Sequence, residues 1–178
     1  CSSDLDYSDQ TPQQIRAMFR AGIAEKLNTS LSNGFQTHSL IGDLRPEANE
    51  DLNRIYSAID YSFDTSFAIL HPKYDSISTG KWSEKKAKKV ELEKRIKNGD
   101  VKFTNVKILD PNLISSLHAE YSADLFVFLT QIDISTKAKD CMDFQAGNFQ
   151  REYKINYAVF DSNARQVYGD VEIGRAHV

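Results

Sequence analysis

The chain has 178 residues, of which 40% are hydrophobic and 11% aromatic, and its formal net charge is −3. This composition is typical of a globular domain with enough chain for one sizeable core, and it does not fit an intrinsically disordered protein. The acidic balance argues against a general nucleic-acid binder. The chain also has no apolar run near the roughly 18 residues that a membrane-spanning helix needs.

The first expected element is a helix that begins at Thr11-Pro12 and ends at Asn33-Gly34. Thr11 suits the N-cap, and Gln14 is placed to complete a capping box with it. Glycine ends helices readily because it adopts the left-handed conformation without steric cost. We interpret the apolar stripe of this helix as a core-packing face, formed by Ile15, Met18, Phe19, Ile23, Leu27 and Leu31.

Three further elements are expected before the middle of the chain. Phe35–Ile41 has the polar interior of an edge strand, and Pro46–Ala58 has the apolar spacing and the early acidic residues of a helix. Ile59–Leu70 keeps its apolar side chains in odd-numbered phase, which is strand periodicity. We expect one long strand there, or a hairpin broken near Asp64.

The segment 83–98 is expected to be a charged helix inserted between two strands. Its basic side chains are candidates for contact with an anionic surface or an acidic partner. The alternative is a solvated helix with no partner. The candidate contact residues are Lys85, Lys86, Lys88, Lys89, Lys94 and Arg95.

The second half of the chain predicts a strand, a helix, a second strand and a C-terminal hairpin. Val101–Leu109 changes its apolar phase near Asn105, which indicates a bulge. After the helix, Leu125–Ile134 begins with five apolar residues, so we expect a central strand covered on both faces at its start. Short links favour a right-handed parallel crossover. The fold class is therefore α/β (α+β is the alternative), with one mixed sheet and flanking helices.

The hairpin has strands at Tyr153–Val159 and Gln166–Val171, joined by a turn at Asp161–Ala164. Four tyrosines lie in strand positions of the chain. If they share one exposed sheet face, they form an aromatic platform for a sugar or a peptide, whereas half-buried packing is the plainer interpretation. They are Tyr61, Tyr153, Tyr157 and Tyr168.

No pattern of catalytic or metal-binding residues emerges, so we expect no enzyme activity and no cofactor. The histidines His38, His71, His118 and His177 are far apart in the sequence, although His38 or His71 could approach Asp60 or Asp64 in space. Cys141 lies between Asp140 and Asp143, whose charges disfavour a thiolate. An unrecognised hydrolase is the third interpretation of function.

Cys1-Ser2-Ser3 resembles the mature start of a bacterial lipoprotein, and the acidic stretch to Gln10 resembles the tether of such proteins. The resemblance implies acylation of Cys1 and a lipid anchor in the outer membrane of a Gram-negative envelope. Residues 1–10 are then a tether, and 11–171 a single domain. The last residues, from Ile173 to Val178, resemble a translated sequencing adapter, so we expect 172–178 to be an artefact and the domain to be truncated.

A second resemblance covers about 70 residues, from Val106–Asp110 through Leu117–Asp124 to the turn at Phe160–Asn163. These segments resemble the periplasmic α/β domain shared by the TolB amino-terminal region, the curli secretion lipoprotein and the lipoprotein activators of cell-wall synthases. The resemblance implies an envelope assembly or accessory role through a protein partner, without catalysis. A ligand-binding envelope domain that uses the tyrosines is the alternative.

Overall fold

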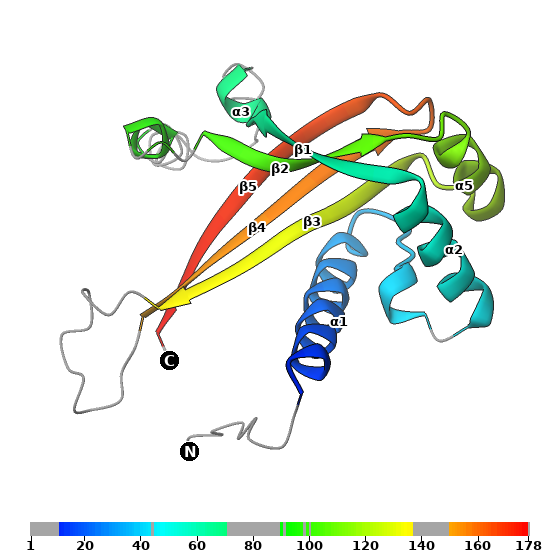
Figure 1. The fold of residues 1–178 in the computed structure, drawn as a ribbon, viewed down its shortest axis with the longest axis horizontal. Coiled ribbons are helices and arrows are strands. Elements are labelled where there is room, and N and C mark those ends of the chain that lie inside the picture. Colours follow the sequence, from blue (N-terminus) through cyan, green and yellow to red (C-terminus); the bar gives the residue numbers. More distant parts are fainter. Residues whose placement is uncertain are drawn as a thin grey trace. The chain divides into compact units, whose positions relative to one another are not determined.

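The structure is a computed structural model that describes residues 11–43, 45–70, 90, 92–97, 99, 101–136 and 150–177 (Figure 1). Its internal contacts divide the chain into two compact units, Cys1–Ser57 and Ala58–Val178. The sequence predicts a single domain over 11–171, whereas the contacts place a division after Ser57.

Helix α1 (Pro12–Leu31) begins as the sequence predicts. The Thr11 side chain accepts a hydrogen bond from the Gln14 amide, and the Gln14 side chain accepts one from the Thr11 amide at 2.8 Å. The end of the helix differs from the prediction. Ser32 is the C-cap, and its N–H donates to the Asn28 carbonyl. Gly34 does not have the positive φ expected of a glycine cap, because backbone hydrogen bonds to Leu31 already close this turn.

Helix α2 (Pro46–Ser57) confirms the second predicted helix, with Ala48 and Ile55 buried. Asp51 is buried as well, and its carboxylate pairs with Arg54 at 2.7 Å. The strand predicted for Phe35–Ile41 is wrong. That stretch lacks a strand partner among the described residues and leads into the short 3-10 helix η1 (Leu40–Gly42), while Phe35 is exposed.

In the second unit, β1 (Ile59–Thr65) pairs antiparallel with β2 (Lys102–Ile108). The strand or hairpin predicted to reach Leu70 is wrong beyond Thr65, where Ser66 begins a turn into α3 (Phe67–Leu70). The bulge predicted near Asn105 is also wrong, because the pairing of β1 and β2 has no register shift. The phase change has another cause: all four residues from Phe103 to Val106 are buried, so β2 is covered on both faces.

The buried polar residues of β2 are hydrogen-bonded, which makes their burial tolerable. The Thr104 amide donates to the Asn156 side chain at 3.1 Å. The Asn105 side-chain amide donates to Asp64 and to Gln166, each at 2.8 Å. These bonds connect β2 to both of the strands that follow in the C-terminal hairpin.

The second sheet contains β3 (Leu125–Thr136), β4 (Gln150–Asp161) and β5 (Gln166–His177), all antiparallel and in the order β3-β4-β5. The predicted hairpin of β4 and β5 is confirmed. Strand β5 continues through 172–177, where Ile173 lies across from Lys154 and His177 across from Gln150. The origin of these terminal residues stays a prediction.

The mixed α/β class is confirmed, but the single mixed sheet with a parallel crossover is wrong. Strands β2 and β3, joined through α5 (Leu113–Tyr121), belong to different sheets. The physical reason is that β2 packs against the face of the second sheet rather than beside its edge, as its contacts with β3, β4 and β5 show (Figure 1).

The core of the second unit forms where β2 and α5 meet the sheet. It consists of the buried side chains of Val106, Ile114, Ala158 and Phe160. Phe126 and Phe128 pack against this cluster, and the Phe128 and Phe160 rings meet edge to face at a centroid distance of 5.6 Å. This packing decides which face of the sheet is covered.

Candidate functional site

Strand β3 is an edge of its sheet, although the sequence predicts that Leu125–Ile134 is a covered centre. Its side chains alternate: Phe126 and Phe128 contact the core, whereas Leu125 and Val127 are each 50% exposed. The prediction rested on the unbroken apolar run, which is typical of a strand covered on both faces. Here, one half of the run points away from the core.

The exposed large apolar side chains of β3, which we call the β3 surface, are Leu125, Val127 and Ile134. Val127 lies across from Val159 of β4, and Ile134 lies across from Tyr153. In the part of the chain that the structure describes, β3 pairs with β4 and with no other strand. An unpaired edge therefore lies beside exposed apolar side chains.

This edge has a register shift between Leu129 and Gln131, but its sequence lacks the lysines and prolines that often prevent strands from associating. Natural edge strands are often protected by lysine, proline or inward-pointing charges. Leu125–Thr136 contains no proline and no basic residue, and its one charged residue is Asp133. The Asp133 carboxylate accepts hydrogen bonds from the Gln131 side chain, 2.9 Å from each oxygen. The eight residues of the strand before Asp133, Leu125–Ile132, carry no charge.

A second cluster of polar side chains surrounds Asp170 of β5, which is only 3% exposed. Arg95 Nη2 lies 2.6 Å from Asp170 Oδ1, and the fully buried Ser66 donates its hydroxyl to the same oxygen at 2.6 Å. The Val171 amide donates to Oδ1 and the Tyr168 hydroxyl to Oδ2. Because both oxygens are engaged, we interpret this carboxylate as a structural tie rather than an acid or base.

The pKa of Arg95 shows the balance of forces in this cluster. Burial by itself acts to lower the pKa of the guanidinium, but the hydrogen bond and the charge of Asp170 outweigh it, so the pKa is raised. The Arg95 guanidinium is therefore charged at physiological pH. The cluster fastens the helical residues 92–97 and the turn at Ser66 to β5.

The structure brings together two of the four candidate tyrosines. The rings of Tyr157 and Tyr168 stack with centroids 6.0 Å apart, and Phe67 lies 5.2 Å from Tyr168. Burial raises the pKa of Tyr157 well above its usual range, and the neighbouring Tyr168 adds to the effect. Tyr153 is half-buried four residues before Tyr157 on β4, while Tyr61 lies in the other sheet and is exposed.

The basic candidates separate in a similar way. Lys85, Lys86, Lys88 and Lys89 lie outside the described residues. Lys94 is exposed, whereas Arg95 points to Asp170 with a side chain that is only 12% exposed. Arg95 is therefore not part of an outward basic surface.

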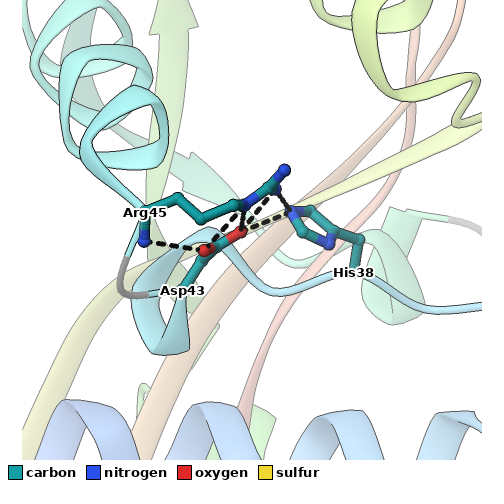
Figure 2. A network of polar contacts seen from close by, with 3 residues as sticks. All are labelled: His38, Asp43 and Arg45. Carbon is teal, nitrogen blue, oxygen red and sulfur yellow. Dashed lines mark hydrogen bonds and ion pairs between the residues drawn. The ribbon is translucent and has the colours of Figure 1, made fainter.

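A polar network in the first unit joins His38, Asp43 and Arg45 (Figure 2). Arg45 holds the Asp43 carboxylate through its side chain, at 2.6 Å for Nη2, and through its backbone amide at 3.0 Å. His38 Nε2 lies 3.3 Å from the same carboxylate. The hydrogen bonds from the Arg45 side chain are the main reason that the pKa of Asp43 falls to about 2.

The remaining candidates do not assemble into a metal or catalytic site in the described part of the chain, where no group of three metal-ligating residues occurs. Asp60 accepts a hydrogen bond from the Tyr61 amide, and Asp64 is held by Ser62 and Asn105. His118 bonds to the Ala123 carbonyl at the end of α5. Cys1, His71 and Cys141 lie outside the described residues, and the side chain of His177 is not described.

Sequence reasoning missed two features of the second unit: the contact between Asp170 and Ser66, and the exposed edge of β3. Asp170 and Ser66 were not singled out, because an acid in a hairpin strand and a serine at a turn have no local signal of a distant partner. The signal that was present for β3 was its lack of charge over Leu125–Ile132, which fits an exposed association edge as well as a buried strand.

Comparison with known proteins adds no assignment: no protein-family model, curated protein or solved structure matches this chain. Among the helices that the structure describes, none is long and apolar enough to span a bilayer.

Proposed function

We propose that this chain is a non-catalytic protein-binding module of the Gram-negative envelope, which acts in assembly or as an accessory protein. The observation that carries the proposal is the edge of β3, which has no strand partner among the described residues and carries Leu125 and Val127, each half exposed. An uncharged strand edge is a template for an added strand, and the apolar side chains beside it supply affinity.

Two physical terms favour a protein partner at this edge. An incoming strand can form backbone hydrogen bonds with the N–H and C=O groups that point away from β4. It also buries apolar area at roughly 25 cal/mol per Å², which is the main driving force of most protein association. The opposite face of β3 is already held by the core through Phe126 and Phe128, so the edge is presented on a rigid support.

The envelope location in this proposal is supported by resemblance. Cys1-Ser2-Ser3 resembles an acylated lipoprotein start, and each acyl chain contributes on the order of 0.8 kcal/mol per buried CH₂ to membrane anchoring. The likeness of Val106–Asn163 to envelope α/β domains points to the same compartment. An anchored module with an exposed strand edge would hold its partner close to the outer membrane.

The alternative of a tyrosine platform for a sugar or peptide is less well supported. Tyr157 and Tyr168 do stack, but Phe67 packs against Tyr168 and the Asp170 cluster adjoins the same pair. Tyr61 belongs to the other sheet. These contacts favour packing of the tyrosines within the protein over a role as an open platform.

The test is site-specific photo-crosslinking in Gram-negative cells, with the chain expressed behind a lipoprotein leader sequence. A photoreactive residue replaces Val127 in one strain and Val167 in the other; Val167 is a partly exposed valine on the opposite edge strand, β5. We expect a protein adduct from position 127 that position 167 does not form. Equal labelling at both positions, or none at 127, would contradict the proposal.

A second variant tests the location. Cys1→Ser, expressed with the same leader, should release the protein from the membrane into the soluble periplasmic fraction. Membrane retention of this variant would show that Cys1 is not the anchor, and it would leave the crosslinking result intact.

A further inference from the structure

We infer that the partner of the β3 surface is β3 of a second copy of this chain, paired antiparallel about Val127. This inference rests on the proposed function and makes it specific. It joins two three-stranded sheets edge to edge in a symmetric dimer, with the strand order β5-β4-β3 followed by β3-β4-β5 of the second copy.

The limits of regular structure place the centre of the pairing. Strand β3 begins at Leu125, and its register against β4 shifts between Leu129 and Gln131. A bulge bends and twists a strand, so it divides β3 into two regular segments, Gln131–Thr136 and Leu125–Leu129. The segment Leu125–Leu129 is the one that is entirely apolar and uncharged. The midpoint of that segment is Val127.

The segment is complementary to itself about this midpoint. In an antiparallel pair with its two-fold axis at Val127, this residue lies opposite Val127 of the second copy. Leu125 then lies opposite Leu129 of the second copy. Directly opposed side chains in antiparallel strands stand about 4.5–5.5 Å apart at Cβ, so apolar groups meet apolar groups throughout. Leu125 and Val127, each 50% exposed, would be covered on the side that faces the second copy.

Charge supports the same partner. Extending the pairing by one residue places Asp124 opposite Thr130 of the second copy, and Asp133 falls beyond the paired segment. No like charges oppose each other in this arrangement. Two-fold pairing also uses both free β3 edges, so it closes at a dimer instead of propagating as a fibre.

The other edge of the sheet is less suited to this role. Strand β5 is contacted by α3, and its Asp170 is tied to Ser66 and Arg95. Glu172 and Asp170 also place two acids on this strand within three residues. The β3 edge is the one with an uncharged, self-complementary segment.

The test uses the full 178-residue chain with Cys1→Ser and Cys141→Ser, so that the introduced thiol is the only one. Single variants Leu125→Cys, Val127→Cys and Leu129→Cys are oxidised under mild conditions. Val127→Cys should form a disulfide-linked dimer. Leu125→Cys and Leu129→Cys should not form a disulfide-linked dimer alone, because each introduced cysteine would lie about 13 Å along the strands from the same position in the second copy. A mixture of those two variants should form the crosslinked heterodimer.

The oligomeric state is measured in parallel by sedimentation on the cysteine-free chain. We expect a dimer whose dissociation constant rises at least about tenfold in Val127→Lys, because a lysine at an edge opposes strand addition. The matched Val167→Lys control on β5 should leave the dimer unchanged. A monomer throughout the micromolar range, crosslinking that ignores the register, or a Val127→Lys dimer as tight as its parent would each overturn the inference.

Failure of the dimer is distinguishable from failure of the proposed function. If the chain is a monomer while photo-crosslinking from position 127 yields an adduct with a different protein, the inference fails and the proposed function stands. If neither a dimer nor an adduct is found, both fail.

Discussion

Arg95 and Asp170 are 75 residues apart in the sequence, yet their side chains meet with Nη2 and Oδ1 at 2.6 Å. The Asp170 carboxylate is almost fully buried, and the Ser66 hydroxyl donates a second short hydrogen bond to it. It connects three segments that no local interaction joins. The stability of this unit should therefore be sensitive to either partner.

Replacing Arg95 by methionine should destabilise the second unit strongly. The change leaves Asp170 buried without its cation, and breaking one side of a buried pair costs about 3–5 kcal/mol. Lys94→Met is the control, because Lys94 is the exposed neighbour on the same helical segment. Urea unfolding followed by circular dichroism measures the difference. The double variant Arg95→Met with Asp170→Asn should regain part of the loss, and equal stabilities of the Arg95 and Lys94 variants would refute the structural role.

Gly169→Ala should also destabilise this unit, for a steric reason. A Cβ at position 169 would overlap the ring of the buried Phe103 and the Gln166 side chain. Overpacking of this kind typically costs about 1–3 kcal/mol. Gly174→Ala on the same strand is the control, since nothing lies within 4 Å of a Cβ there. The double variant Gly169→Ala with Phe103→Leu should restore stability, because leucine lacks the ring atoms that would overlap the new Cβ. Thermal unfolding is the measurement.

Asn156→Leu should destabilise the second unit by removing a hydrogen-bond partner of a buried polar group on β2. The Asn156 side-chain oxygen accepts the Thr104 amide at 3.1 Å, so leucine would leave a buried N–H without an acceptor. The cost of such a group is about 1–3 kcal/mol. Hydrogen exchange of the Thr104 amide should accelerate with the loss of stability. Asn163→Leu, in the exposed turn before β5, should change neither quantity appreciably.

The first unit should show a pH dependence centred on Asp43. Its pKa in the folded chain is about 2, against 3.8 for the ordinary carboxyl, because Arg45 stabilises the charged form. A lowered folded pKa contributes stability that is present above the unfolded pKa and is lost as the pH falls through the folded value. The contribution should therefore disappear between about pH 4 and pH 2.

The Asp43 titration can be followed through its side-chain carboxyl carbon by NMR. Arg45→Gln should move the midpoint back towards 3.8, because it removes the charge and the three hydrogen bonds of the guanidinium. An unchanged midpoint in Arg45→Gln would mean that Arg45 does not hold the carboxylate in solution.

Elements that depend on near neighbours were predictable. The capping box at Thr11 and Gln14 needs only a short stretch of chain, and α1 begins where this pair places it. The turn at Asp161–Ala164 is closed by local bonds, including the Arg165 amide to the Asp161 carboxylate, and the hairpin follows from it. The mixed α/β class follows from the same local periodicities.

Pairing choices between distant strands were not predictable in this way. The five apolar residues at the start of β3 fit a central strand and an exposed edge strand equally well. The hydrophobic pattern shows only which side chains are apolar, and not which other strand lies beside them. Likewise, four buried residues in a row on β2 gave the pattern of a bulge, and the odd-phase run after Thr65 gave the pattern of a strand where α3 forms. Each error concerns a contact made by residues far apart in the chain.

The amino-acid sequence alone specified the starts of α1 and α2, the C-terminal hairpin and the absence of charge along the start of β3, since these are properties of neighbouring residues. Tertiary structure decided that β3 is an edge, that β2 is covered on both faces, and that Arg95 turns inward to Asp170. The physical reason is that burial and ion pairing depend on which distant segments meet. That choice is made by the packing of the whole unit and not by any one stretch of it.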